Sequence, residues 1–176
     1  MTVYNWSALT NDQSIAFNPS TDKLTFDIST ISAASLSLSW VSNTSTSFSY
    51  SGKTVRLLTD VRALTTTNVT LANGSLLIVG DNETVTAADD GNSGLNGSAQ
   101  ADQLLGLGGD DWFNGGGGND YIDGGGKGTW GDTVGFDGAT AGVNVNLTTG
   151  RAEDGQGGVC GWRYAHQYRE RHRFGL

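Results

Sequence analysis

Apolar and polar residues alternate in short runs through the first half of the chain. Runs of about four to eight residues with this alternation, separated by Asn, Pro, Ser or Gly, are typical of β-strands joined by turns. No long run with helical periodicity occurs between residues 1 and 87. These residues therefore predict an all-β N-terminal module of unknown role, with strands inside the runs 14–18, 23–27, 35–41, 46–52, 53–58 and 75–81.

Aromatic residues in this module are candidates for its core. Because every second side chain of a strand faces the same way, we expect an inward-facing set made of Trp6, Phe17, Phe26, Trp40 and Phe48. An alternative is that Trp40, Phe48 and Tyr50 are exposed and stack on sugar rings. We favour the core interpretation, which assigns no ligand to residues 1–87.

A second pattern follows, in which glycine-rich blocks repeat along the chain. The blocks span 97–105, 106–114, 115–123 and a longer 124–135, which has three extra residues. Each block begins with glycine and carries an apolar residue two positions after an aspartate. The aspartates are Asp102, Asp111, Asp120 and Asp132, and the apolar residues are Leu104, Phe113, Ile122 and Val134.

This spacing predicts a stack of short strands. About three residues of each block suffice for one strand, and the glycines allow the positive-φ turns that connect the strands. Two blocks complete one coil, so alternate blocks stack about 4.8 Å apart. Asp102 then lies over Asp120, and Asp111 lies over Asp132. Stacked carboxylates repel one another unless a cation neutralises them.

Calcium is the cation that this arrangement favours. It takes six to eight oxygen ligands in loose geometry, whereas magnesium demands a tight octahedron and transition metals favour His or Cys. The pattern G-G-x-G-x-D-x-U-x is also a known calcium-binding repeat. The predicted ligands are the aspartates and the carbonyl groups of turn glycines, namely Asp102, Asp111, Asp120, Asp132, Gly106, Gly108, Gly109, Gly115, Gly116, Gly117, Gly118, Gly124 and Gly125.

With these blocks the chain resembles the RTX (repeats-in-toxin) family of hemolysin-type calcium-binding proteins. The resemblance covers roughly residues 88–158, although Ser93 replaces an aspartate and Lys127 replaces a turn glycine. It implies a parallel β-roll, a type of β-solenoid, that folds when it binds Ca²⁺. It also implies a bacterial protein that is secreted by a type I exporter and acts outside the cell. We therefore expect residues 88–158 to form this roll and a following strand segment.

Two other interpretations of the glycine-rich region are weaker. A disordered linker has this composition, but a linker has no reason to keep aspartate and a following apolar residue in phase over four blocks. A phosphate-binding loop at 124–129 (GGGKGT) is disfavoured because Lys127 is followed by Gly128 instead of Ser or Thr, and because no helix pattern follows.

Catalytic motifs are absent from the sequence. It has neither a zinc-protease H-E-x-x-H nor a G-x-S-x-G nucleophile elbow. The histidines, His166 and His172, and the one cysteine, Cys160, all fall in the last 18 residues. We therefore expect a module without enzymatic activity of its own. The alternative is a truncated fragment of a larger secreted RTX hydrolase or adhesin.

The last segment, 159–176, differs in charge from everything before it. The chain has ten basic and 18 acidic residues, of which the segment holds four and one, so it is net +3 and residues 1–158 are net −11. One explanation is a basic nucleic-acid-binding or membrane-surface tail. We favour a frameshift, because the back-translated tail, moved one nucleotide forward, permits a phrase L-x-N-I-E-N-V-x-G-S that resembles segments after RTX repeats. We then expect an out-of-frame basic tail that lacks the secretion signal, no nucleic-acid partner and no membrane span.

Overall fold

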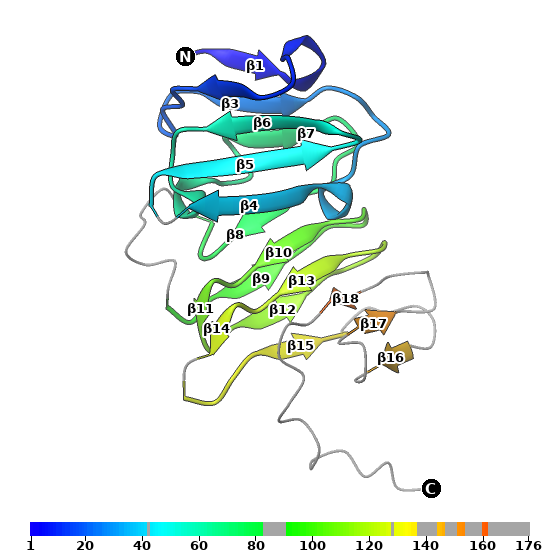
Figure 1. Ribbon diagram of the computed structural model, residues 1–176. Coiled ribbons are helices and arrows are strands. Elements are labelled where there is room, and N and C mark those ends of the chain that lie inside the picture. The colour runs from blue at the N-terminus through cyan, green and yellow to red at the C-terminus, as the bar shows by residue number, and fades with distance from the viewer. Residues whose placement is uncertain are drawn as a thin grey trace, which may run out of the picture.

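The computed structural model describes residues 1–41, 43–82, 91–127 and 129–136, together with the backbone of three later strands, 144–146, 151–153 and 160–161. These residues form strands and three short 3-10 turns and contain no α-helix. The predicted all-β class is therefore confirmed. Most of the strands follow one another in tiers from the N-terminal end downwards (Figure 1).

The N-terminal part is built from two sheets. One is entirely parallel and joins β1 (Val3–Asn5), β3 (Lys23–Phe26) and β7 (Val69–Leu71). The other has the order β2-β6-β5-β4, with bounds Gln13–Ile15, Lys53–Leu57, Ser45–Tyr50 and Ser37–Val41. Its β2–β6 pair is parallel, whereas β6, β5 and β4 are antiparallel neighbours. The 3-10 turns are η1 (Trp6–Ala8), η2 (Ala33–Ser35) and η3 (Val61–Ala63). Every predicted run overlaps a strand, but β1 and β7 were not predicted.

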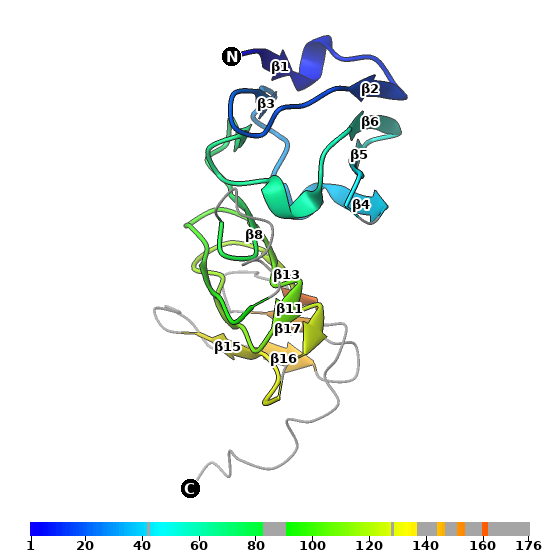
Figure 2. The same ribbon diagram turned by 90° about the vertical axis from the view of Figure 1, so that its left-hand side faces the viewer.

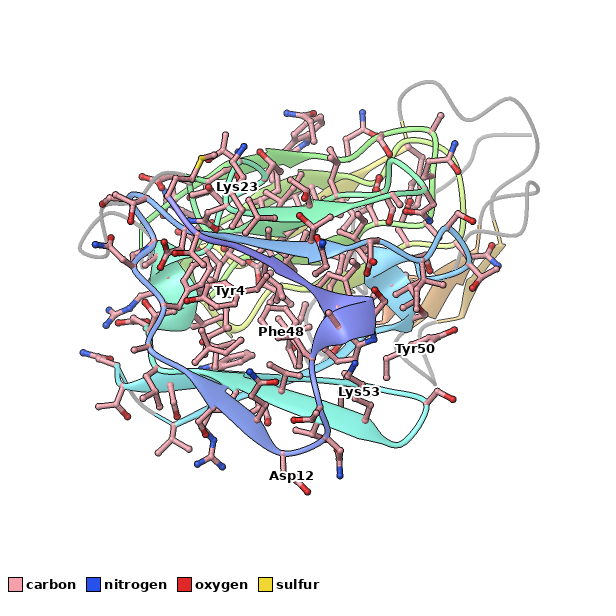
Figure 3. All side chains as sticks on the ribbon, turned by 90° about the horizontal axis from the view of Figure 1, so that it is seen from above. Tyr4, Asp12, Lys23, Phe48, Tyr50 and Lys53 are labelled. Atoms are coloured by element: carbon pink, nitrogen blue, oxygen red, sulfur yellow. The ribbon has the colours of Figure 1, made fainter. Side chains whose placement is uncertain are left out.

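Aromatic packing between these two sheets forms much of the larger core. The Phe26 ring lies 4.8 Å from Trp6 and 5.6 Å from Phe48, measured between ring centroids. Phe17 is also buried, as predicted. In the view from the N-terminal end, Tyr4 and Phe48 lie between the sheets and Asp12 lies at a turn outside them (Figure 3). The prediction for Trp40 is wrong, since its side chain is 42% exposed. Trp40 belongs to β4, the edge strand, which has a neighbour on one side only.

Parallel strands also form the glycine-rich region. One sheet stacks β8 (Leu77–Val79), β10 (Gln103–Leu105) and β13 (Tyr121–Asp123). Another stacks β9 (Gly94–Asn96), β12 (Trp112–Asn114) and β15 (Thr133–Gly135). A short third pair joins β11 (Gly108–Gly109) to β14 (Gly126–Lys127). Figures 1 and 2 both show these strands below the N-terminal sheets.

The register of these sheets is the one that the block length predicts. Leu104 pairs with Ile122, and Phe113 pairs with Leu95 on one side and Val134 on the other. Their side chains form a second core cluster, which contains Ile78, Leu95, Leu104, Phe113 and Ile122, with Val134 packed against it. Because β8 pairs with β10, this sheet contains strands from both sides of the predicted boundary at residue 88. The boundary itself falls at residues 83–90, outside the described part of the chain.

Beyond residue 136, the structure describes three short strands. β16 (Asn144–Asn146), β17 (Arg151–Glu153) and β18 (Cys160–Gly161) form an antiparallel sheet. Apart from Cys160 and Gly161, the predicted out-of-frame tail lies outside the described residues. No helix in the described part of the chain is long and apolar enough to cross a membrane.

Candidate metal centre

The structure brings the predicted aspartates together in the predicted pairs. Asp120 Oδ1 accepts the backbone N–H of Asp102 at 2.9 Å, and Asp132 Oδ1 accepts that of Asp111 at the same distance. The tiers before them repeat this contact, because Asp102 Oδ1 accepts the N–H of Leu76 and Asp111 Oδ1 that of Ser93. Each aspartate therefore turns its carboxylate inward, onto the backbone of the preceding tier.

The first glycine of each block makes room for this inward carboxylate. A side chain on Gly97, Gly106, Gly115 or Gly124 would overlap Oδ2 of the aspartate in its own block. A Cβ atom on Gly106 would also lie 2.9 Å from the carbonyl oxygen of Gly124 in the next tier. Carboxylate and carbonyl oxygens thus lie close together around these glycines, and an alanine at any of them would force the turn apart.

Left-handed backbone conformations account for several of the other glycines predicted as ligands. Gly109, Gly116, Gly118 and Gly125 have φ between 74° and 111°, a region that L side chains rarely adopt. Leu107 shares this conformation at φ 68° although it has a side chain. Gly108 lies in strand β11, and Gly117 donates its N–H to the carbonyl of Ser98.

At the Asp102 side of the stack, the protein itself provides partners for both carboxylate oxygens. Oδ1 accepts from the Leu76 N–H at 2.7 Å and from the Ser98 hydroxyl at 3.0 Å, and Oδ2 accepts from the Ser98 N–H. The side chain is fully buried. Burial raises the pKa of Asp102, and the bonds from Ser98 and Leu76 act against that rise.

At the Asp111 side, one carboxylate oxygen has no such partner. Asp111 is 2% exposed, and its Oδ1 accepts from the Ser93 N–H at 2.8 Å. Its Oδ2 is one of two buried side-chain oxygens in the described residues that lack a hydrogen-bond partner, the other being Gln103 Oε1. Burial raises the pKa of Asp111 to about 7, against the bond from Ser93, and the charges of Asp132 and Asp110 add to the rise.

Two further acidic residues surround this side of the stack, and neither was predicted from the sequence. Asp110 accepts backbone N–H groups from the turn that precedes Asp132. Asp123 accepts the N–H of Gly125 at 3.1 Å. Burial raises the pKa of Asp132, and the charges of Asp110 and Asp123 raise it further against the bond from Asp111. Adjacency to Asp111 and to the end of a repeat strand was the available sequence signal for these two residues.

The groups gathered at the Asp111 side are oxygen donors, the kind that hard cations prefer. Among the described residues, no group of three or more His, Cys, Asp or Glu side chains is placed to hold a metal ion. A cation at the Asp111 side would therefore have to take backbone carbonyl oxygens as well as carboxylates, which is the mixture that calcium accepts. The buried, unpartnered Oδ2 of Asp111 and the carbonyl oxygen of Gly124 both lie close to the position that a Cβ on Gly106 would occupy, which fits this requirement.

Comparison of the chain with models of protein families, with curated proteins and with solved structures gives no match.

Proposed function

We propose that this protein is a calcium-binding module of a secreted, RTX-type bacterial protein and has no catalytic activity of its own. In this proposal the repeats form a parallel β-roll that is completed by Ca²⁺ outside the cell, where calcium is millimolar. The observation that carries the proposal is Asp111 Oδ2, a buried carboxylate oxygen without a hydrogen-bond partner. An ionised carboxylate is costly to bury unless it is paired, and a cation removes that cost.

The aspartates Asp111 and Asp132 would hold the ion together with carbonyl groups of the turn glycines. Bound calcium would neutralise the carboxylates and link successive tiers. Because the ligands come from different tiers, the ion binds well only when the tiers are stacked. Binding free energy then contributes directly to folding.

A calcium titration of the whole chain tests this proposal. We expect about 0.1–1 mM Ca²⁺, the range of extracellular modules, to increase β-structure in circular dichroism and to protect residues 97–135 from proteolysis. Residues 1–79 should change little, and magnesium should act much more weakly.

Asp111→Asn should abolish most of the response. Asp12→Asn is the matched control, because Asp12 is exposed at a turn with φ 59°, where Asn is well tolerated. A chain whose spectrum and protease map ignore calcium up to about 10 mM, ten times the expected range, would overturn the proposal.

A further inference from the structure

The twelve-residue block carries its three extra residues at one defined place. In the third parallel pair, Gly108 is matched with Gly126, 18 positions later. In the next pair, Trp112 is matched with Thr133, 21 positions later. The three extra residues therefore lie between Lys127 and Asp132. Without compensation, this insertion would displace Asp132 from its place opposite Asp111.

A single carboxylate holds the inserted segment. Asp110 Oδ2 accepts the backbone N–H of Thr129 at 3.0 Å, and Oδ1 accepts those of Trp130 at 2.8 Å and of Gly131. The N–H of Asp110 in turn donates to Asn92 Oδ1 at 2.8 Å, one tier away. Hydrogen bonds to a charged acceptor are stronger than those between neutral groups. Three consecutive N–H groups thus find one charged acceptor that is itself fixed to the stack.

Side-chain packing does not explain how the inserted segment is placed. The Trp130 side chain is 88% exposed, and Thr129 is exposed as well. The block 115–123, which has glycine at every glycine position of the motif, has Asn119 at the position that Asp110 occupies in its own block. The acidic side chain of Asp110 therefore occurs in the block that lies against the insertion, and the nine-residue block 115–123 has a neutral amide at this position.

We infer that Asp110 is a positioning residue. It binds the backbone of residues 129–131, a contact that we call the clasp, and thereby places Asp132 against the backbone of Asp111. Only the expected effect of Asp110 on calcium affinity rests on the proposed function. The clasp itself is a property of the chain. Asp110 acts through Asp132, since both of its own oxygens accept backbone N–H groups. Its removal should release the segment and loosen the bond between the Asp111 N–H and Asp132 Oδ1, which is 2.9 Å long.

Hydrogen exchange of the Asp111 amide, measured in the full chain with saturating calcium and in metal-free buffer, tests the inference. We expect Asp110→Ala to speed this exchange roughly tenfold or more, the size expected when bonds to a charged acceptor are lost. Asp110→Asn keeps one acceptor oxygen and should give a smaller effect. The amide of Asp102, which donates to Asp120 on the other side of the stack, should not change. Trp130→Ala is the matched control within the segment and should have no effect.

A compensating variant separates positioning from a general loss of stability. Replacing residues 127–131 by Gly-Asn removes the insertion and reproduces the turn GGGGND of residues 115–120. In this background Asp110→Ala should leave the Asp111 amide protected, and calcium affinity should return to the level of the parent. Persistence of the full Asp110→Ala effect there would overturn the inference, because no insertion would remain to be held.

The outcomes also separate this inference from the proposed function. If calcium does not bind but Asp110→Ala still speeds exchange at Asp111, the calcium proposal fails and the clasp stands. If calcium binds and Asp110→Ala changes neither exchange at Asp111 nor affinity, the clasp fails alone. An Asp111 amide that exchanges without protection in the parent chain under both conditions would also overturn the inference, since the contact that Asp110 is meant to secure would not exist.

Discussion

The two sides of the repeat stack use the same aspartate for different purposes. Asp102 and Asp111 occupy equivalent block positions, both are buried, and both accept an N–H from the preceding tier. Asp102 obtains two further hydrogen bonds from Ser98. Asp111 leaves Oδ2 without a partner. The repeat motif therefore does not by itself determine whether an aspartate needs a cation.

The residue after the first glycine of each block explains much of this difference. In block 97–105 it is Ser98, which donates both its N–H and its hydroxyl to Asp102. In block 106–114 it is Leu107, which has no hydroxyl and takes a left-handed conformation at φ 68°. The Asp102 side is thus completed by the protein, whereas the Asp111 side, with Asp110, Asp123 and Asp132 nearby, has an excess of negative charge. A divalent cation is more strongly favoured at the second side.

The largest expected effect comes from removing one carboxylate at each side. If calcium binds at the Asp111 side, stability should increase in proportion to the logarithm of calcium concentration above the dissociation constant. Asp111→Asn should remove most of that dependence over the same concentration range, because the loss of a ligand raises the dissociation constant. Asp102→Asn should lower stability by about 1–3 kcal/mol, the cost of leaving buried donors unsatisfied, and should leave the slope unchanged.

Urea unfolding followed by circular dichroism at four or five calcium concentrations checks this prediction. Asp12→Asn serves again as the control and should change neither slope nor intercept. Equal slopes for the Asp102 and Asp111 variants would mean that the two sides are equivalent, and the comparison drawn above would then be wrong.

A smaller effect should appear when pH is varied without calcium. The pKa of Asp111 is about 7 in the folded chain, above its ordinary value of 3.8, so folding takes up a proton between these values. The stabilisation is fully present below about pH 4 and is lost as pH rises through 7, by at most about 1.4 kcal/mol per pH unit. Asp102 and Asp132 act in the same direction, since their pKa values are also raised. The lowered pKa values of Asp22 and Asp60 act below pH 3.8.

Metal-free chain should therefore be more ordered at pH 5 than at pH 8, by circular dichroism and by protease resistance of residues 97–135. Asp111→Asn should flatten the profile between pH 5 and 7.5, because the side chain that keeps its proton longest is gone. Saturating calcium should reverse the trend, since protons and calcium compete for the same carboxylates. A metal-free chain that gains order as pH rises from 5 to 8 contradicts the prediction.

The repeats were the part of the fold whose strand pairing local sequence could predict. Gly97, Gly106 and Gly115 recur with the aspartates and inward apolar residues, and each such block encodes its own turn and strand. The register between alternate blocks follows from block length alone. The pairing of β1 with β3 and of β3 with β7 joins residues 20 and 45 positions apart, without a repeated spacing that could signal it. Trp40 was misplaced for a related reason, because its exposure depends on β4 being an edge strand.

The difference between the two metal-site candidates was also beyond the sequence pattern. Asp102 sits in a block that keeps the motif's aspartate and apolar residue but only the first of its three glycines, and its partners come from Leu76 and Ser98. Leu76 lies 26 residues earlier in the chain, so its N–H could be assigned only once the tiers were stacked. In the same way, the contacts of Asp110 could not be predicted from its position next to Asp111, because its partners are backbone N–H groups of residues 129–131.

The smallest expected effect tests whether Ser98 is what distinguishes the two sides. Ser98→Ala removes the hydroxyl that donates to Asp102 Oδ1 and also accepts the N–H of Gln100 at 3.1 Å. We expect a loss of about 0.5–1.5 kcal/mol, the same at every calcium concentration, because the two backbone bonds to Asp102 remain. Ser98→Gly goes further, since glycine lets this turn adopt the left-handed conformation of Gly116 and Gly125. If Ser98 alone keeps Asp102 from needing a cation, the glycine variant should raise the slope of stability against the logarithm of calcium concentration. An unchanged slope would assign the difference to the extra charges of Asp110 and Asp123 instead.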